Sequence, residues 1–180
     1  FITQYFMNKF CIQFNYQLTL IYEIIFWYHM DKLIRKGEIK DIDLIAKYNI
    51  AMALETENKV LDDETITNGV SSIIRDKSKG QYWVMEIDNL LVGQLMVTYE
   101  WSDWRNGMMW WIQSVYVEPH YRRQGVYSSL YNNLVKMAKS DPGCCGIRLY
   151  VEKENIEAQD TYKSLGMKNA GYEIMEFTTK

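Results

Sequence analysis

The sequence predicts an α/β fold, a single α+β domain with a mixed sheet and helices on both faces. From residue 32 onward, strand-like and helix-like segments follow in the order β-αα-βββ-α-β-α-β. The run of three adjacent strands favours an antiparallel meander, and the later βα units favour parallel pairing. The 180 residues are 48% hydrophobic, with only two prolines and ten glycines. This composition can fill one core and argues against disorder.

The first part of the domain combines one strand with two helices. Residues 32–37 predict a short strand. Asp41 and Asp43 begin a helix whose apolar residues recur at helical spacing as far as Met52. The acidic residues 62–64 begin a second helix, because negative side chains in a first turn suit the helix dipole.

Three strands follow these helices. Residues 81–87 and 90–99 are rich in apolar and aromatic side chains. They are joined at 88–89 by Asp-Asn, which tolerates a left-handed backbone, so they predict a hairpin. A polar loop at 102–107 leads to a third long strand at 109–117.

The last third alternates helices and strands. A helix is predicted near 125–139, and the Asp-Pro-Gly sequence at 141–143 ends it. A strand at 147–151, a helix at 155–165 and a final strand at 171–177 complete the order of elements.

Residues 1–31 form a hydrophobic segment of different composition, ahead of the domain at 32–180. Its apolar run is long enough to cross a bilayer, but several polar residues interrupt it, among them Glu23. Since Met30 looks like a natural start, we favour residues 1–29 as an extension outside the domain that need not be native coding sequence. A membrane anchor and an additional packing helix are the alternatives.

Charge and side-chain content argue against several classes of protein. The net charge is −3 and no block of basic residues occurs, so we expect no nucleic-acid partner. Cys11, Cys144 and Cys145 form no Cys-x-x-Cys or Cys/His cluster, which favours a reducing, cytoplasmic location and no structural metal. The two histidines, His29 and His120, lie in no sequence context that supports a Ser-His or Cys-His mechanism.

One segment combines several features that bind phosphate. An apolar strand ends at 115–117, Pro119 breaks it, and Arg122, Arg123 and Gly125 precede an amphipathic helix. The first N–H groups of a helix have no partner within it, and the helix dipole adds positive charge there. A glycine lets a diphosphate approach the backbone, and arginines add forked donors. This order predicts a site for a phosphate-bearing cofactor, with an ordinary basic turn as the structural alternative.

With these motifs in place, the chain resembles the GNAT superfamily of N-acetyltransferases over residues 32–178. The element order is similar to the family's. Residues 122–127, Arg-Arg-Gln-Gly-Val-Tyr, are similar to its diphosphate loop, Gln/Arg-x-x-Gly-x-Gly/Ala, except that Tyr127 stands at the last position. The residues that match the second motif of the family are Asn155, Ala158, Tyr162 and Gly166.

The resemblance implies that acetyl-CoA lies between two splayed central parallel strands, at 110–117 and 147–151. It implies cofactor contacts from the first strand, the loop, the start of the following helix and the later helix. These residues are Val115, Tyr116, Val117, Arg122, Arg123, Gln124, Gly125, Val126, Tyr127, Ser128, Asn155, Ala158 and Tyr162. Core packing, surface charge and helix capping are the structural alternatives. The large Tyr127 could crowd the diphosphate or point away from it.

The resemblance also implies direct attack of a primary amine on the thioester, in a ternary complex. Tyr162 would donate to the departing sulfur. Full proton transfer from a phenol to a thiolate costs only about 2 kcal/mol, because their ordinary pKa values are about 10 and 8.5. For the base that deprotonates the amine we nominate Glu100, acting through water, with Glu86 second. A backbone N–H of Val115 or Tyr116 would hold the oxyanion.

Aromatic and acidic residues surround the expected acceptor site. Trp101, Asp103 and Trp104 lie between two central strands and suit the amine of a small cationic molecule or peptide. The resemblance also implies that the carboxylates between the first two helices border the acceptor cleft, namely Glu55, Glu57, Asp62, Asp63 and Glu64. Packing of the tryptophans in the core or in a homodimer seam is the alternative. The competing function is a non-catalytic module that binds or senses acyl-CoA.

Overall fold

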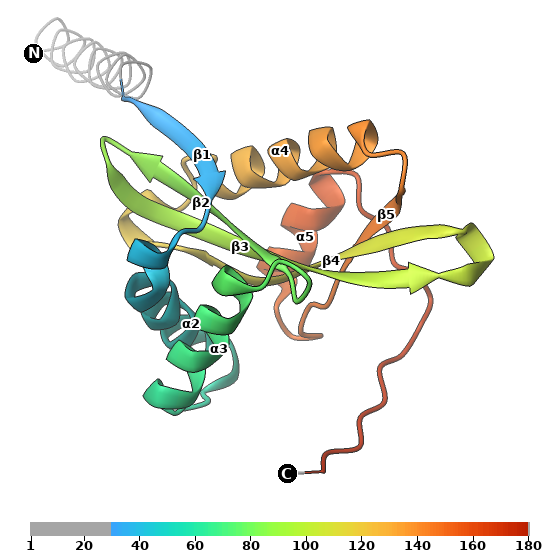
Figure 1. The fold of residues 1–180 in the computed structure, drawn as a ribbon, viewed down its shortest axis with the longest axis horizontal. Coiled ribbons are helices and arrows are strands. Elements are labelled where there is room, and N and C mark those ends of the chain that lie inside the picture. The colour runs from blue at the N-terminus through green and yellow to red at the C-terminus, as the bar shows by residue number, and fades with distance from the viewer. Residues whose placement is uncertain (1–29, 180) are drawn as a thin grey trace, which may run out of the picture.

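The computed structural model describes residues 30–179 of the 180-residue chain, and the expectations for residues 1–29 lie outside this part. Five strands form one sheet in the order β1-β2-β3-β4-β5 (Figure 1). The strands are β1 (Lys32–Lys36), β2 (Gln81–Ile87), β3 (Leu90–Ser102), β4 (Gly107–Val117) and β5 (Cys144–Leu149). The helices are α2 (Ile42–Glu57), α3 (Asp63–Arg75), α4 (Val126–Ser140) and α5 (Ile156–Ser164). Short 3-10 turns occur as η1 (Ile39–Asp41), η2 (Asp103–Arg105) and η3 (Pro119–Tyr121).

The sheet is mixed, as the sequence predicts. Strands β1 to β4 pair antiparallel in succession, and β5 pairs parallel to β4. The parallel ladder runs from Met108 opposite Cys144 to Ile112 opposite Leu149 and then stops. Beyond Ile112, β4 continues for five residues without β5 beside it, which confirms the splayed central strands.

Helices cover both faces of the sheet (Figure 1). Successive strand residues point to opposite faces, so each central strand contributes to two cores. Val84 packs in a cluster with Ile45 and Val70 of α2 and α3, while its neighbour Met85 packs in the cluster with Leu130 of α4. A fully buried side chain such as Ile45 or Leu130 contributes about 1.5–3 kcal/mol. No helix within residues 30–179 is long and apolar enough to cross a membrane.

Most predicted elements form close to their predicted bounds, with two shifts. The Asp88-Asn89 turn is left-handed at both residues, as the hairpin requires. The loop predicted at 102–107 is instead the end of a long β3–β4 hairpin, with η2 at its tip (Figure 1). Strand β5 begins three residues earlier than expected and ends at Leu149.

The strand predicted at 171–177 is wrong, because these residues form no strand in the structure. Tyr172 contacts the Arg148 guanidinium with its ring, at 5.8 Å, yet no ladder forms along the free edge of β5. Ile174 and Phe177 are exposed. Apolar alternation describes which side chains could share a face, but a strand exists only when a neighbouring strand takes up its backbone hydrogen bonds.

Candidate functional site

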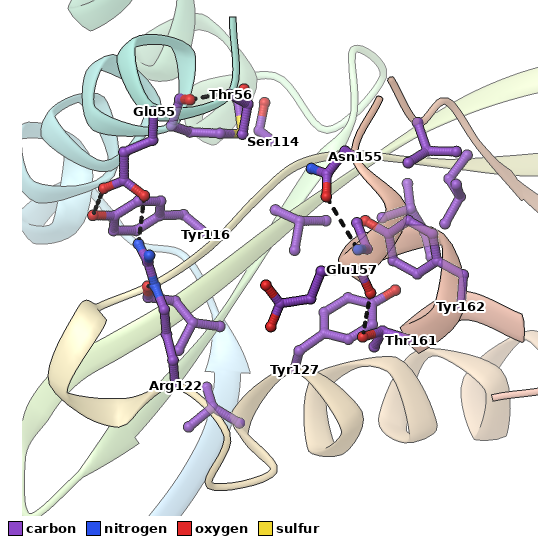
Figure 2. Close-up of a pocket in the computed structure, with 18 of the residues that line it drawn as sticks. Glu55, Thr56, Ser114, Tyr116, Arg122, Tyr127, Asn155, Glu157, Thr161 and Tyr162 are labelled. Atoms are coloured by element: carbon purple, nitrogen blue, oxygen red, sulfur yellow. Dashed lines mark hydrogen bonds and ion pairs between the residues drawn. The ribbon is translucent and has the colours of Figure 1, made fainter. Parts of the chain in front are cut away.

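A cavity of about 850 Å³ opens where β4 and β5 diverge. Its walls come from the C-terminal end of α2, the second half of β4, the start of α4, the residues after β5, and α5 (Figure 2). This volume lies in the range of small-molecule sites, about 300–1,000 Å³. Within residues 30–179, no group of three or more His, Cys, Asp or Glu side chains comes together to hold a metal ion.

A β-bulge shapes the β4 wall of the cavity. Gln94 pairs with Tyr116 and Met96 with Gln113, so Ser114 and Val115 together stand opposite Leu95. Ser114 has a φ of 49°, a left-handed backbone that costs a non-glycine residue about 1–3 kcal/mol. The bulge breaks the strand alternation, and residues 112–117 all line the cavity.

Buried polar side chains lie beneath this bulge. The Gln94 amide donates to the Asn49 oxygen at 2.7 Å and approaches the Ser114 carbonyl at 3.4 Å. The Asn49 amide donates to the Tyr82 hydroxyl at 2.9 Å. Burial raises the pKa of Tyr82, and hydrogen bonds with Asn49 and Ser114 oppose that rise. Gln94 Oε1 is buried without a partner among residues 30–179.

The first turn of α4 borders the cavity, and its first N–H groups have no hydrogen-bond acceptor among residues 30–179. Gly125 caps the helix with a φ of 79°, and no side chain caps it and no acidic residue lies in its first turn. The first N–H bonded within the helix is that of Ser129, to the Gly125 carbonyl at 2.9 Å. The preceding residues 126–128 line the cavity. By contrast, Asp62 caps α3. An uncapped terminus that faces a cavity is suited to an anion.

An ion pair links the loop between β4 and α4 to α2 (Figure 2). Arg122 donates to Glu55 at 2.7 Å and to the Val117 carbonyl at 2.9 Å, and its guanidinium lies 5.3 Å from the centre of the Tyr116 ring. The Tyr116 hydroxyl donates to the other Glu55 oxygen at 3.0 Å. Burial raises the pKa of Tyr116, and the bond to Glu55 raises it further. Arg123 lines the same cavity with a left-handed backbone.

Two tyrosines meet between α4 and α5. The rings of Tyr127 and Tyr162 lie edge to face with centroids 5.5 Å apart, and both residues line the cavity. Burial raises the pKa of each hydroxyl, so both keep their protons at neutral pH. The Tyr127 hydroxyl is buried without a partner among residues 30–179. Tyr127 therefore turns toward Tyr162 rather than away from the site.

Helix α5 completes the wall opposite α2. The Asn155 side-chain oxygen accepts from the Ala158 N–H at 3.1 Å, so the capping interpretation of Asn155 is confirmed. Asn155, Ala158 and Tyr162 share one helix face at i, i+3 and i+7, and all three line the cavity. The predicted cofactor residues thus come together, except that Gln124 lies outside the lining and donates to the His120 carbonyl.

The two carboxylates nominated as bases lie outside the cavity lining. Glu100 accepts from the Trp111 indole at 2.8 Å and pairs with Arg148 at 3.5 Å. Trp111 stacks on Tyr150, which does line the cavity, so Glu100 stands two contacts away from it. Glu86 pairs with Arg35 on the other side of the sheet's centre, between β1 and β2. A role for Glu100 through water stays a prediction.

The predicted acceptor residues lie at the end of the β3–β4 hairpin. Trp101 is 59% exposed and Trp104 is 87% exposed. Neither they nor Asp103 line the cavity. At about 3.4 Å per strand residue, Gly107 at the start of β4 lies roughly 17 Å from Ile112, where the parallel ladder ends, and the hairpin tip lies beyond Gly107. Contact of these residues with an acceptor stays a prediction.

Several lining residues were not predicted from the sequence. Thr161 follows Ala158 by one helical turn, a spacing that could have identified it. Ser114 could not be found, because strand alternation places it on the face opposite Val115 and only the bulge overrides this. Tyr150 and Glu152 lie just after β5, where the predicted strand bounds hid them.

Known proteins match this chain over most of the described part. The family model described as "Acetyltransferase (GNAT) family" matches residues 45–167. A solved structure described as a possible acetyltransferase from Clostridium difficile 630 is 46% identical, with a TM-score of 0.79, and the match covers 83% of this chain and 98% of that one.

Two further relatives match less of the chain or less closely. A thialysine N-epsilon-acetyltransferase of Bos taurus is 34% identical over 79 residues, 44% of this chain and 45% of the relative. The match thus spans about half the length of that curated relative. A predicted acetyltransferase with acetyl-CoA from Clostridium acetobutylicum has a TM-score of 0.67 at 20% identity, covering 82% of this chain and 96% of that one. That likeness concerns the fold alone.

Proposed function

Because the chain belongs to the acetyltransferase (GNAT) family, we propose that it transfers an acetyl group from acetyl-CoA to a primary amine. The amine attacks the thioester directly, in a ternary complex with the donor. The new bond joins the amine nitrogen to the acetyl carbon. The bond that breaks joins this carbon to sulfur, and the electron pair leaves on the sulfur.

The uncapped start of α4 carries the proposal. Residues 126–128 line the cavity, their N–H groups have no acceptor within the described part of the chain, and Gly125 leaves open space in front of them. The diphosphate of acetyl-CoA binds these groups, with Arg123 beside it. The pantetheine arm lies along the β4 edge that β5 leaves unpaired, at Val115 and Val117. In this proposal acetyl-CoA therefore lies in the gap between β4 and β5, with its diphosphate at the loop before α4 and its acetyl group at the β4 bulge.

The reacting carbonyl lies at the bulge in this proposal. Of the two candidate N–H groups, that of Val115 stabilises the oxyanion as the amine attacks, because Tyr116 pairs with Gln94 of β3. Tyr162 donates a hydrogen bond to the departing sulfur, and proton transfer from it is energetically accessible. Because burial raises the pKa of Tyr162 above its ordinary value near 10, this donor persists well into alkaline pH.

The amine must lose a proton to a base, and two carboxylates are candidates. Glu100 acts through water; it accepts from Trp111, which stacks on the cavity residue Tyr150. Glu55 is the alternative, since it lines the cavity directly. If Glu100 is the base, Glu100→Gln lowers kcat by about 10²–10⁴-fold. A kcat within twofold of wild type would transfer the role to Glu55.

A cationic amine is the acceptor that the lining favours. The cavity carries the carboxylates Glu55, Glu57, Glu152 and Glu157 against the guanidiniums Arg122 and Arg123. When the cofactor diphosphate binds, its negative charge offsets that of the two guanidiniums. The carboxylates then leave the cavity with a net negative charge, which attracts a cation. The curated relative is named for the ε-amine of thialysine. Trp101, Asp103 and Trp104 extend this acceptor surface if the acceptor is a peptide long enough to reach the hairpin.

Mass-spectrometric turnover against a panel of primary amines and lysine peptides tests the function. Calorimetry with acetyl-CoA runs in parallel. We expect both acetyl-CoA binding and an acetylated product. Binding without product from any amine would support the acyl-CoA-sensing module instead. Failure to bind acetyl-CoA would remove both functions.

A further inference from the structure

Three buried polar side chains from three other elements converge on the bulge of β4. Asn49 comes from α2, Tyr82 from β2 and Gln94 from β3, and each is at most 2% exposed. Gln94 reaches the Ser114 carbonyl at 3.4 Å and donates to Asn49, which in turn donates to the Tyr82 hydroxyl. We propose that Asn49, Tyr82 and Gln94 are positioning residues for acetyl transfer, because their network holds Ser114 left-handed and so aims the N–H of Val115, the second bulge residue, into the cavity. This inference rests on the proposed function.

Packing alone does not require polar groups at these positions. The neighbours Ile45, Val84 and Met96 are apolar and buried in the same cluster. Gln94 Oε1 has no partner among residues 30–179. A buried network with an unsatisfied acceptor is commonly no more stable than an apolar core of the same volume. Polar groups kept in such a core are best known for fixing a register.

In this proposal the three residues fix the register of β3 against β4 at the bulge. Ser114 is one of six described non-glycine residues with positive φ, and it is the one inside a strand. Without polar partners beneath it, Ser114 returns to an extended backbone. The β3–β4 ladder then becomes continuous past Leu95. A change of one residue in register turns the N–H group of Val115 away from its present direction.

The network therefore acts on catalysis through the backbone rather than by contact with the substrate. Gln94 is fully buried, and Asn49 and Tyr82 do not line the cavity. Loss of the network should thus lower the rate of the chemical step more than the affinity for acetyl-CoA. The diphosphate site at α4 lies on another element and stays intact.

Gln94→Met tests this inference, with Gln81→Met as the matched control. Both glutamines are buried in the sheet, and both donate to a backbone carbonyl. The Gln81 side-chain amide donates to the Tyr82 backbone carbonyl at 3.0 Å, within β2 and away from the β4 bulge. We expect Gln94→Met to lower kcat at least about tenfold with the acetyl-CoA Kd within about threefold. Gln81→Met should change neither value.

Crystal structures of the variants give a readout that does not depend on activity. We expect Ser114 to leave the left-handed region in Gln94→Met and to keep it in Gln81→Met. A left-handed Ser114 retained in Gln94→Met would refute the holding role. A relaxed bulge with unchanged kcat would refute the catalytic consequence. If Gln94→Met does not fold, Tyr82→Phe removes one hydroxyl with its ring kept, and the same two readouts decide.

The outcome is separable from that of the proposed function. If the wild-type chain acetylates no amine in the panel, the acetyl-transfer function fails. The conformation of Ser114 in the variants still tests whether the network holds the bulge.

Discussion

Replacing Gly125 with glutamate places a carboxylate where the diphosphate is expected to bind. Gly125 lines the cavity, and a Cβ built on it meets nothing within 4 Å. The added side chain is therefore accommodated in the free protein and points at an anion in the complex. A like charge at about 5 Å, with an effective dielectric constant of about 20, costs about 3 kcal/mol. This corresponds to a Kd for acetyl-CoA that rises at least about 100-fold.

The substitution also strains the backbone, and the two effects can be separated. Gly125 has a φ of 79°, so any other residue there costs about 1–2 kcal/mol of stability. Gly125→Ala carries this strain without the charge. Gly166→Glu carries the charge at a comparable φ of 92°, outside the cavity lining. Isothermal titration calorimetry gives the Kd, and urea unfolding gives the free energy of unfolding.

We expect a lowered stability in all three variants and a lost affinity only in Gly125→Glu. An acetyl-CoA Kd within threefold of wild type in Gly125→Glu would refute the diphosphate site at α4. An equal loss of affinity in Gly166→Glu would show that the effect is not local to the cavity.

Three further changes probe the donor, the ion pair and the pH dependence. Tyr162→Phe removes a hydrogen bond to developing thiolate, so kcat should fall about 10- to 100-fold in steady-state assays with the acetyl-CoA Kd unchanged. Glu55→Gln releases Arg122 for the diphosphate, so the Kd should fall, by up to about fivefold because the pair is half exposed. Burial alone would raise the pKa of Asp41, but bonds from Arg35 hold it below its ordinary value. Asp41 thus stabilises the fold above about pH 4 and loses this effect as pH falls through its lowered pKa. Asp41→Asn should lower the free energy of unfolding by about 3 kcal/mol at pH 7 and flatten its decline in acid.

Matched variants distinguish these effects from general damage. Tyr131→Phe removes the hydroxyl of an α4 tyrosine outside the cavity lining, and kcat should not change. Glu57→Gln removes a nearby lining carboxylate, and a gain in affinity equal to that of Glu55→Gln would point to overall charge instead of the ion pair. Asp43→Asn, at an exposed position of α2, should leave the pH dependence of stability as it is. Equal losses of kcat and affinity in Tyr162→Phe would make that tyrosine structural.

Most elements of the fold could be predicted from local sequence features. The Asp88-Asn89 turn, the capped start of α3 and the glycine before α4 each depend on neighbours a few residues away. Such features follow from turn and capping chemistry. The strand expected at 171–177 failed, because its pairing partner is far away in the chain and alternation says nothing of whether the two meet.

The cofactor side of the site was more predictable than the acceptor side. Asn155, Ala158 and Tyr162 share one helix face, so their spacing alone places them together. Glu100 and Trp104 were placed near the acceptor from the order of elements. Their distance from the cavity depends on how far the β3–β4 hairpin extends, and this follows from pairing between strands.

The sequence by itself determined that a helix begins after Gly125, with arginines beside its start. Helix capping and dipole effects are local, so this feature can be recognised without coordinates. Only the tertiary structure decided that Ser114 is left-handed, that Asn49, Tyr82 and Gln94 meet beneath it, and that β4 and β5 part at Ile112. These features depend on contacts between residues 20 to 45 positions apart, which packing brings together and no local pattern encodes.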